Sequence, residues 1–394
     1  MTLFFTIVFF VFLLVVVLQC ALIRFILPER MSGPRKTLIA ACVASCFNTI
    51  PFLYMAKAPI LDQLAWWHRE LIVYPYAIVL VASAFSGLLF LALWSFRPIL
   101  QRLWPPFEKG KRDFLGTSAR TLVVTSVGAL SYGAYWENKS LEVSRLTLKY
   151  KGLHPQLSGL RIVQLTDFHA GPLISFQTIS EVISAANALK PDLIILTGDY
   201  VNHNPAYIHG CASLLDELKA PAGVFGVYGN HDHYTGMVAM REAFSKTHLS
   251  MLSDGCGPAK GLEGVLNIIG AEDPVSGWAR DAQFSDVSRI SSLVDPHRFN
   301  LLLSHRPGLF RTSKDWKVGL TLSGHTHGGQ VIFPGIGDKG FSLAGLFVSY
   351  THGLYESEKD AEVRMYVSRG IGTIIAPVRL FCPPEIVEIT LAAA

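Results

Sequence analysis

Charged residues are scarce in this chain. Lys, Arg, Asp and Glu make up 16% of the 394 residues, against roughly 25% in soluble globular proteins. Half of the residues are hydrophobic, and this excludes a disordered or strongly solvated chain. The same balance disfavours a protein that is soluble along its whole length.

Cysteine pairs and basic runs are also missing. None of the six cysteines forms a Cys-x-x-Cys pair, which excludes a thiolate zinc site and predicts no disulfide framework. The part of the chain after residue 136 has no run of basic residues. We therefore do not expect nucleic acid as a partner.

Three long segments lack charge altogether, at 2–23, 37–56 and 71–96. A helix needs about 20 apolar residues to cross a bilayer, so we predict a span in each, with a buried core helix as the alternative. A fourth span is predicted at 114–136, where Arg120 can reach the interface. The predicted organisation is a membrane section over 1–136 with four transmembrane helices, followed by a catalytic domain over 137–394.

The charges between these segments predict their orientation. The loops at 24–36 and 97–120 contain ten Lys and Arg residues, against two in the loop at 57–70. Because cytoplasmic loops collect Lys and Arg, four spans put the domain after residue 136 on the other side. We expect an integral protein of the cell (inner) membrane with its catalytic domain on the outer or periplasmic face. Without the fourth span, the domain would be cytoplasmic.

Strands alternate with helices in the second part. Apolar residues that recur every three or four positions predict helices at 174–189, 212–218 and 238–244. Short apolar runs predict strands at 161–165, 192–196, 224–228, 265–269, 301–303, 320–322, 364–367 and 386–389. This alternation predicts a layered α/β domain.

Five short polar motifs follow the ends of predicted strands. They are Asp167-Phe168-His169, Gly198-Asp199, Gly229-Asn230-His231-Asp232, Ser304-His305 and Gly324-His325-Thr326-His327. In open α/β sheets, sites form beyond the carboxyl ends of the strands. Residues two apart on an extended segment point the same way, so Asp-x-His and His-x-His can each direct two ligands into one cavity. Carboxylate, imidazole and amide donors without sulfur suit Mn, Fe or Zn.

The five motifs in this order resemble the calcineurin-like metallophosphoesterase superfamily, and more closely its branch with N-terminal transmembrane spans. The resemblance implies a four-layer αββα sandwich with two divalent metal ions at the sheet ends. It implies that one metal is held by Asp167, His169 and His327, the second by Asn230, His305 and His325, and that Asp199 bridges both. It also implies that His231 faces the substrate and neutralises the phosphoryl group or protonates the leaving oxygen, while Asp232 holds the His231 ring.

Three further residues lie beside these motifs. Arg306 and His233 are candidate substrate-binding residues, with a salt bridge as the alternative for Arg306 and a surface-loop position as the alternative for His233. Asn202 stands where many relatives carry a second acid after Gly-Asp-x-x, and we expect it to alter the substrate rim.

The predicted function is a membrane-anchored, dinuclear metal-dependent phosphoesterase. It would hydrolyse a phosphodiester or monoester, lipid-linked substrates included, by attack of a metal-bound hydroxide. The alternatives are a pyrophosphatase acting on a nucleotide-linked acylated sugar of the lipid A type, and an inactive metal-binding membrane sensor or scaffold. The glycine-broken apolar segment at 333–355 is interpreted as an acyl-chain groove or bilayer-dipping loop, or as ordinary packing.

Overall fold

The computed structural model describes residues 16–17, 19–20, 23–24, 27, 31–55, 78, 121, 125–126, 128–275, 287–335, 339–374 and 376–394. The chain divides into two compact units, Met1–Tyr135 and Trp136–Ala394.

The first unit contains helix α2, which runs over Gly33–Met55. This helix includes nearly all of the span predicted at 37–56. Among the described residues, however, no helix combines the length and the apolar character that crossing a bilayer requires. The predicted spans at 2–23 and 71–96, and the first part of the span at 114–136, lie largely outside the described residues.

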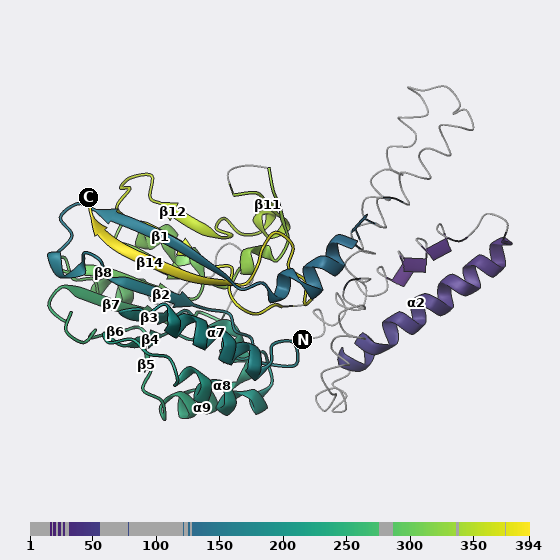
Figure 1. The fold of residues 1–394 in the computed structure, drawn as a ribbon, viewed down its shortest axis with the longest axis horizontal. Helices are drawn as coiled ribbons and strands as arrows, with labels where there is room; N and C mark the ends of the chain where they lie inside the picture. The colour runs from purple at the N-terminus through teal and green to yellow at the C-terminus, as the bar shows by residue number, and fades with distance from the viewer. Residues whose placement is uncertain are drawn as a thin grey trace, which may run out of the picture. The chain divides into compact units, whose positions relative to one another are not determined.

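The second unit is built on two six-stranded sheets and a two-stranded one (Figure 1). The first sheet has the order β1 (Glu142–Tyr150), β14 (Glu385–Ala393), β2 (Arg161–Leu165), β3 (Leu193–Leu196), β4 (Val224–Gly226), β5 (Ser250–Met251). The second has the order β12 (Gly353–Glu356), β13 (Arg364–Val367), β9 (Leu320–Ser323), β8 (Phe299–Ser304), β7 (Leu266–Ala271), β6 (Gly255–Gly257). Strands β10 (Ile332–Phe333) and β11 (Phe341–Ser342) form the small antiparallel sheet.

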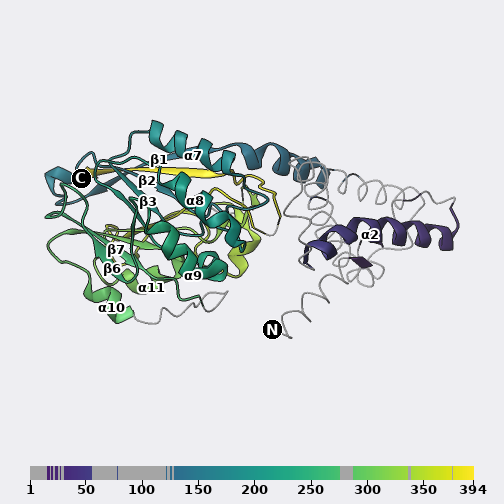
Figure 2. The same ribbon diagram turned by 90° about the horizontal axis from the view of Figure 1, so that it is seen from below.

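Helices cover the outer face of each large sheet. The first sheet is covered by α7 (Phe176–Ala188), α8 (Ile208–Leu215) and α9 (Asn230–Phe244), the second by α10 (Val287–Ser292) and α11 (Phe310–Ser313). Figure 2 shows α7 outside β1–β3, and α10 and α11 beyond β6 and β7. The layers follow the order helix, sheet, sheet, helix in a mixed α/β fold, which is the order that the family resemblance implies.

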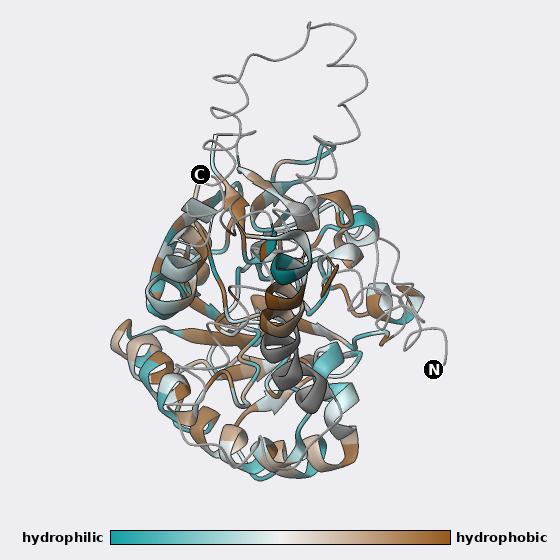
Figure 3. Cartoon of the chain, turned by 90° about the vertical axis from the view of Figure 1, so that its right-hand side faces the viewer, coloured by the Kyte–Doolittle hydropathy of each residue, from teal (hydrophilic) through white to brown (hydrophobic). Residues whose placement is uncertain are grey.

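Side chains on opposite faces of the strands form two hydrophobic cores, one between the two large sheets and one between the first sheet and its helices. In β3, Leu193 and Ile195 face the second sheet, whereas Ile194 and Leu196 face the helices. Successive residues of a strand point to opposite faces, so one buried apolar strand supplies two cores. In Figure 3, brown hydrophobic segments run along interior strands, and the outer helices alternate brown and teal.

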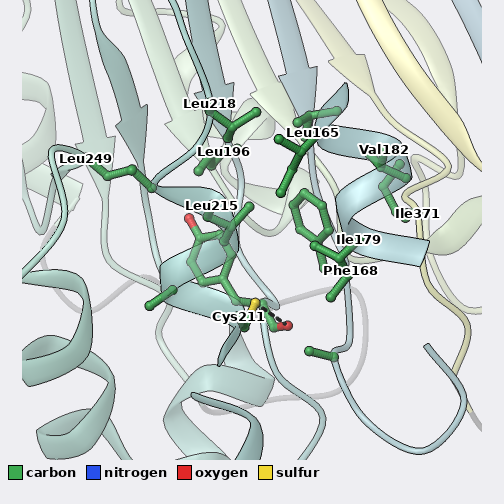
Figure 4. Close-up of a cluster of buried hydrophobic side chains, with 14 of the residues drawn as sticks. Leu165, Phe168, Ile179, Val182, Leu196, Cys211, Leu215, Leu218, Leu249 and Ile371 are labelled. Carbon is green, nitrogen blue, oxygen red and sulfur yellow. Dashed lines mark hydrogen bonds between the residues drawn. The ribbon is translucent and has the colours of Figure 1, made fainter. Parts of the chain in front are cut away.

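Helix α7 shows how a helix is fixed to this sheet. Its buried residues Ile179, Val182, Ile183 and Ala186 recur at helical spacing and form one apolar stripe. The Ser175 hydroxyl caps the first turn by accepting a hydrogen bond from the Thr178 amide. Figure 4 shows Ile179 and Val182 packed near Leu165, with Cys211 and Leu215 of α8 in the same cluster.

Most predicted elements are present, with shifted ends. The strands predicted at 161–165 and 364–367 coincide with β2 and β13. Helix α8 begins and ends earlier than the predicted 212–218. Helix α9 begins at Asn230 instead of Val238, because Gly236 interrupts it with φ 131° and regular apolar spacing starts only after this kink.

Candidate metal centre

The five polar motifs meet at one edge of the paired sheets. Strands β2, β3 and β4 run parallel, as do β8 and β9 in the other sheet. Each motif follows the carboxyl end of one of these strands. The fold therefore collects side chains that are up to 160 residues apart in the sequence, as Asp167 and His327 are.

The first group consists of Asp167, His169 and His327, all fully or almost fully buried. Nε2 of His169 lies 3.1 Å from Nε2 of His327. Nε2 of His327 lies 3.5 Å from Oδ1 of Asp167. The donor atoms of the three residues lie within 4.8 Å of one another, which is close enough to surround one cation.

The second group consists of Asp199, His305 and His325, with Asn230 beside them. Nε2 of His305 lies 3.2 Å from Oδ2 of Asp199 and 3.2 Å from Oδ1 of Asn230. Nδ1 of His325 lies 3.1 Å from the same nitrogen of His305. Two imidazoles, a carboxylate and an amide therefore converge on a second point.

Asp199 lies between the two groups. Its Oδ2 is 3.2 Å from Nε2 of His305 in the second group and 3.5 Å from Nε2 of His169 in the first. One carboxylate therefore reaches donors of both groups. This is the geometry needed to share negative charge between two cations about 3.5–4 Å apart.

The hydrogen bonds of the histidines fit a role as metal ligands. Nδ1 of His305 lies 2.7 Å from the Thr197 carbonyl and Nδ1 of His327 lies 3.1 Å from the Gly372 carbonyl. A carbonyl only accepts, so Nδ1 carries a proton in both rings, and Nε2 is the nitrogen that faces the group and offers a lone pair once it carries no proton of its own. Opposed lone pairs at 3.1 Å repel unless a proton or a cation lies between them. The donor set thus fits two divalent cations.

The backbone at the site is strained. Five of the seven predicted ligands have φ values between 51° and 73°, namely Asp167, His169, Asp199, His325 and His327. Non-glycine residues rarely adopt this left-handed conformation, and such strain clusters at functional sites. The sharp turns let each chain segment leave its strand and still direct its side chain into the site.

Burial and mutual charge set the protonation of these groups. Burial lowers the pKa of His169 and His325 well below the usual range, and burial together with Arg379 lowers the pKa of His327 to about 3. Burial also opposes protonation of His305, but the Asp199 carboxylate outweighs it and raises the pKa of His305 to about 10. For Asp199, burial is outweighed by His305, so its pKa lies well below the usual range. Three imidazoles are therefore neutral at pH 7.

His231 stands beside both groups. Its amide donates to Oδ1 of Asp199 over 2.8 Å, and its ring meets that of His169 edge to face, with centroids 4.6 Å apart. Nδ1 of His231 lies 3.2 Å from Oδ1 of Asn202. Burial lowers the pKa of His231 to about 4, so the ring is neutral at pH 7.

Asp232 makes different contacts from those predicted. Instead of holding the His231 ring, its carboxylate accepts hydrogen bonds from backbone amides. Its donors are the amides of Gly229 (2.9 Å), Asp199 (2.9 Å), Tyr200 (2.8 Å) and Val201 (3.3 Å). Asp232 therefore fixes the turn that carries Asp199. Two side chains lie beside the His231 ring: Asn202, which the sequence placed only at the substrate rim, and His203, whose Nδ1 is 3.2 Å from Nδ1 of His231.

The two candidate substrate-binding residues have acidic neighbours. Nε of Arg306 lies 2.9 Å from Oδ2 of Asp273, and both side chains are buried. The structure thus shows the salt-bridge alternative for Arg306. Nε2 of His233 lies 3.2 Å from Oε1 of Glu272, so its substrate contact stays a prediction.

The sequence is similar to those of known metallophosphoesterases. The family model described as calcineurin-like phosphoesterase matches residues 160–329. An uncharacterized metallophosphoesterase of Bacillus subtilis (strain 168), YkuE, is 31% identical over 72% of this chain and 96% of its own length. An uncharacterized metallophosphoesterase of Aquifex aeolicus (strain VF5) is 31% identical over 67% of this chain and 97% of its own length. The chain belongs to the calcineurin-like metallophosphoesterase family.

Membership decides the class of reaction. This metallophosphoesterase is a hydrolase that acts on phosphoric ester bonds. The matched residues 160–329 include every predicted metal ligand and His231. A transmembrane protein with metallophosphoesterase domain from Danio rerio is 28% identical over 69% of this chain and 62% of its own length, so the likeness extends to a relative that is named for a membrane section.

Proposed function

We propose that this metallophosphoesterase hydrolyses a phosphodiester or monoester with two divalent cations held between its paired sheets. The observation that carries the proposal is the position of Asp199 between two histidine groups, with one oxygen 3.5 Å from His169 and 3.2 Å from His305. The first group would hold one cation, and the second group with Asn230 would hold the other. Mn, Fe and Zn all suit this donor set.

The chemistry divides between the cations and the chain. Two bound cations would lower the pKa of a coordinated water and offset charge on the phosphoryl oxygens. The protein orients the ester and supplies a hydrogen-bonding group to the leaving oxygen. His231 is placed for this role, because its amide is fixed on Asp199 and its Nδ1 faces Asn202. Its other nitrogen, Nε2, is the one left to face the substrate.

The proposal is tested on the full chain, purified in detergent. The protein is stripped with a chelator and reloaded with Mn(II), Fe(II) or Zn(II). It is then assayed on p-nitrophenyl phosphate, bis(p-nitrophenyl) phosphate, a pyrophosphate diester and phospholipids. We expect stripping to abolish ester hydrolysis and reloading to restore it, with two ions bound per chain. Hydrolysis that survives stripping, or protein that binds no ion, would overturn the proposal.

The N-terminal part is proposed to anchor the enzyme in the cell membrane, with the catalytic domain on the outer or periplasmic face. The uncharged segments at 2–23, 37–56 and 71–96 and the excess of Lys and Arg in the loops at 24–36 and 97–120 support this. A membrane-held site favours an amphipathic, lipid-linked phosphate. Protease added to intact cells or spheroplasts should digest the domain; digestion only after lysis would reverse the sidedness.

A further inference from the structure

Arg379 is a buried cation outside the predicted ligand set. It is fully buried and has the largest side chain of the described residues with that degree of burial. A buried charge normally has a carboxylate partner. In the described part of the chain, no carboxylate forms an ion pair with this guanidinium, and its Nε has no hydrogen-bond partner.

Main-chain carbonyls surround the guanidinium instead. Nη2 donates to the carbonyls of Arg369 (2.9 Å), Gly370 (3.0 Å) and Gly372 (2.5 Å), and Nη1 donates to that of Cys382 (3.0 Å). The cation thus ties the loop that follows β13 to the residues just before β14. Hydrogen bonds from a charged donor are the stronger kind, so this loop is held firmly although it belongs to no strand.

The loop that Arg379 holds, residues 369–372, contacts the first metal group. The Gly372 carbonyl that accepts from Arg379 also accepts from Nδ1 of His327 over 3.1 Å. The Gly372 amide donates to the Asp167 carbonyl over 2.6 Å. The Cys382 thiol donates to the His327 carbonyl over 3.2 Å. Two of the three residues of the first group therefore rest on the segment that Arg379 holds.

The second group has a different support. Nδ1 of His305 bonds to the carbonyl of Thr197. Thr197 directly follows β3, and its amide donates to the Leu165 carbonyl over 3.1 Å, which continues the sheet. A carbonyl held by the sheet needs no added cation to stay in place, whereas the Gly372 carbonyl lies in a loop.

We propose that Arg379 is a positioning residue for the first metal group alone. By holding the Gly372 carbonyl, it fixes the His327 ring with Nε2 directed toward Asp167 and His169. The inference rests on the proposed function, because it concerns the affinity of a cation that this function requires. Partners that orient ligating histidines typically contribute 10–100-fold in metal affinity.

The test is Mn(II) binding to the metal-free full-length protein, measured by calorimetry and by metal content after gel filtration. For Arg379→Met we expect one ion to keep its wild-type affinity and the other to bind 10–100-fold more weakly. Arg379→Lys keeps the charge but has fewer hydrogen-bond donors. Its affinity for the weaker ion should therefore lie between those of Arg379→Met and the wild type. A general loss of structure would weaken the binding of both ions, and the affinities would not follow the charge of the substituted residue.

The matched control is Arg369→Met. This arginine is on the same loop, but its guanidinium meets the carboxylates of Glu142 and Glu385, and its main-chain carbonyl stays available to Arg379. We expect the control to bind two ions with wild-type affinities. Circular dichroism of the metal-free variants checks that each is folded.

The outcomes separate this inference from the function. Unchanged affinities in Arg379→Met, or equal weakening of both ions, would overturn the role of Arg379 while leaving the metal centre intact. Failure of both the Met and the Lys variant to fold would also overturn it, because the arginine would then serve the whole fold. A wild-type protein that binds no ion would instead overturn the proposed function.

Discussion

The carboxylate of Asp199 contacts residues of both metal groups. It faces His169 on one side and His305 on the other, and it accepts the His231 amide. We predict that Asp199→Ala lowers ester hydrolysis more than about 10³-fold, because neither group is then complete. Metal content should fall from two ions toward none. A variant that still binds two ions would show that the groups do not share this residue.

We predict for His231 a role in turnover without a role in metal retention, although its donor atom lies within 4.8 Å of those of His169 and Asp199. Its ring lies beside the first group, but the predicted ligand set is complete without it. We predict that His231→Ala keeps two bound ions and slows hydrolysis by about 10²–10⁴-fold, the usual range for a lost proton donor or acceptor. Metal content and kcat are measured on the same preparation. Turnover at the wild-type rate would contradict the role.

Asn202 is a neutral neighbour of the His231 ring. A carboxylate beside an imidazole favours the protonated ring and raises its pKa. Since the pKa of His231 is about 4 in this structure, we predict that Asn202→Asp raises it by about 1 unit or more. In the pH profile of kcat, the part that reports the titration of His231 should then move to higher pH. For Asn202→Ala we expect no such move.

At the level of elements, close packing at the strand ends places the ligands. A Cβ added at Gly324, directly after β9, would lie 2.3 Å from Oδ2 of Asp167. We predict that Gly324→Ala displaces this carboxylate, costs about 1–3 kcal/mol of stability and weakens one bound ion. Gly264→Ala is the control, because a Cβ there has no atom within 4 Å. Equal melting temperatures and metal affinities in the two variants would refute the steric argument.

The sequence predicts the strand ends well because the central strands are fully buried apolar runs. Strand β3, which is Leu-Ile-Ile-Leu and buried throughout, and the Asp199 motif after it are an example. The contact predicted for Asp232 is wrong, because successive helix residues point about 100° apart and His231 and Asp232 both lie in the first turn of α9. A signal existed: an Asp at the third helical position can accept from the backbone amide of the N-cap residue, here Gly229, as the acidic residue of a capping box does.

Other features of the site have no local signal. The four acceptors of Arg379 are main-chain carbonyls, and no motif marks an arginine for such a role. The Thr197 and Gly372 carbonyls that orient His305 and His327 are likewise set by the tertiary fold. Residue type predicts which side chains can bind metal, whereas their supports emerge only when distant segments pack.

For the whole molecule, metal binding, folding and pH are linked. In the metal-free protein the pKa of His305 is about 10 because of Asp199, so this histidine is charged at pH 7. Its folded pKa exceeds the unfolded value of about 6.5. The stabilisation from this ion pair is therefore complete below about pH 6.5 and is lost as the pH rises toward about 10. A cation at Nε2 must displace the same proton, so metal affinity rises with pH.

These opposite slopes predict how the melting temperature responds to metal. We expect the gain in melting temperature on adding a fixed excess of Mn(II) to increase from pH 6.5 to pH 8.5, because the affinity rises by up to about tenfold per pH unit when one proton is released. Differential scanning calorimetry with and without the ion measures the gain, and calorimetric titration in buffers of different ionisation enthalpy counts the proton. If the gain in melting temperature did not depend on pH and no proton were released, the cation would not displace a proton from His305.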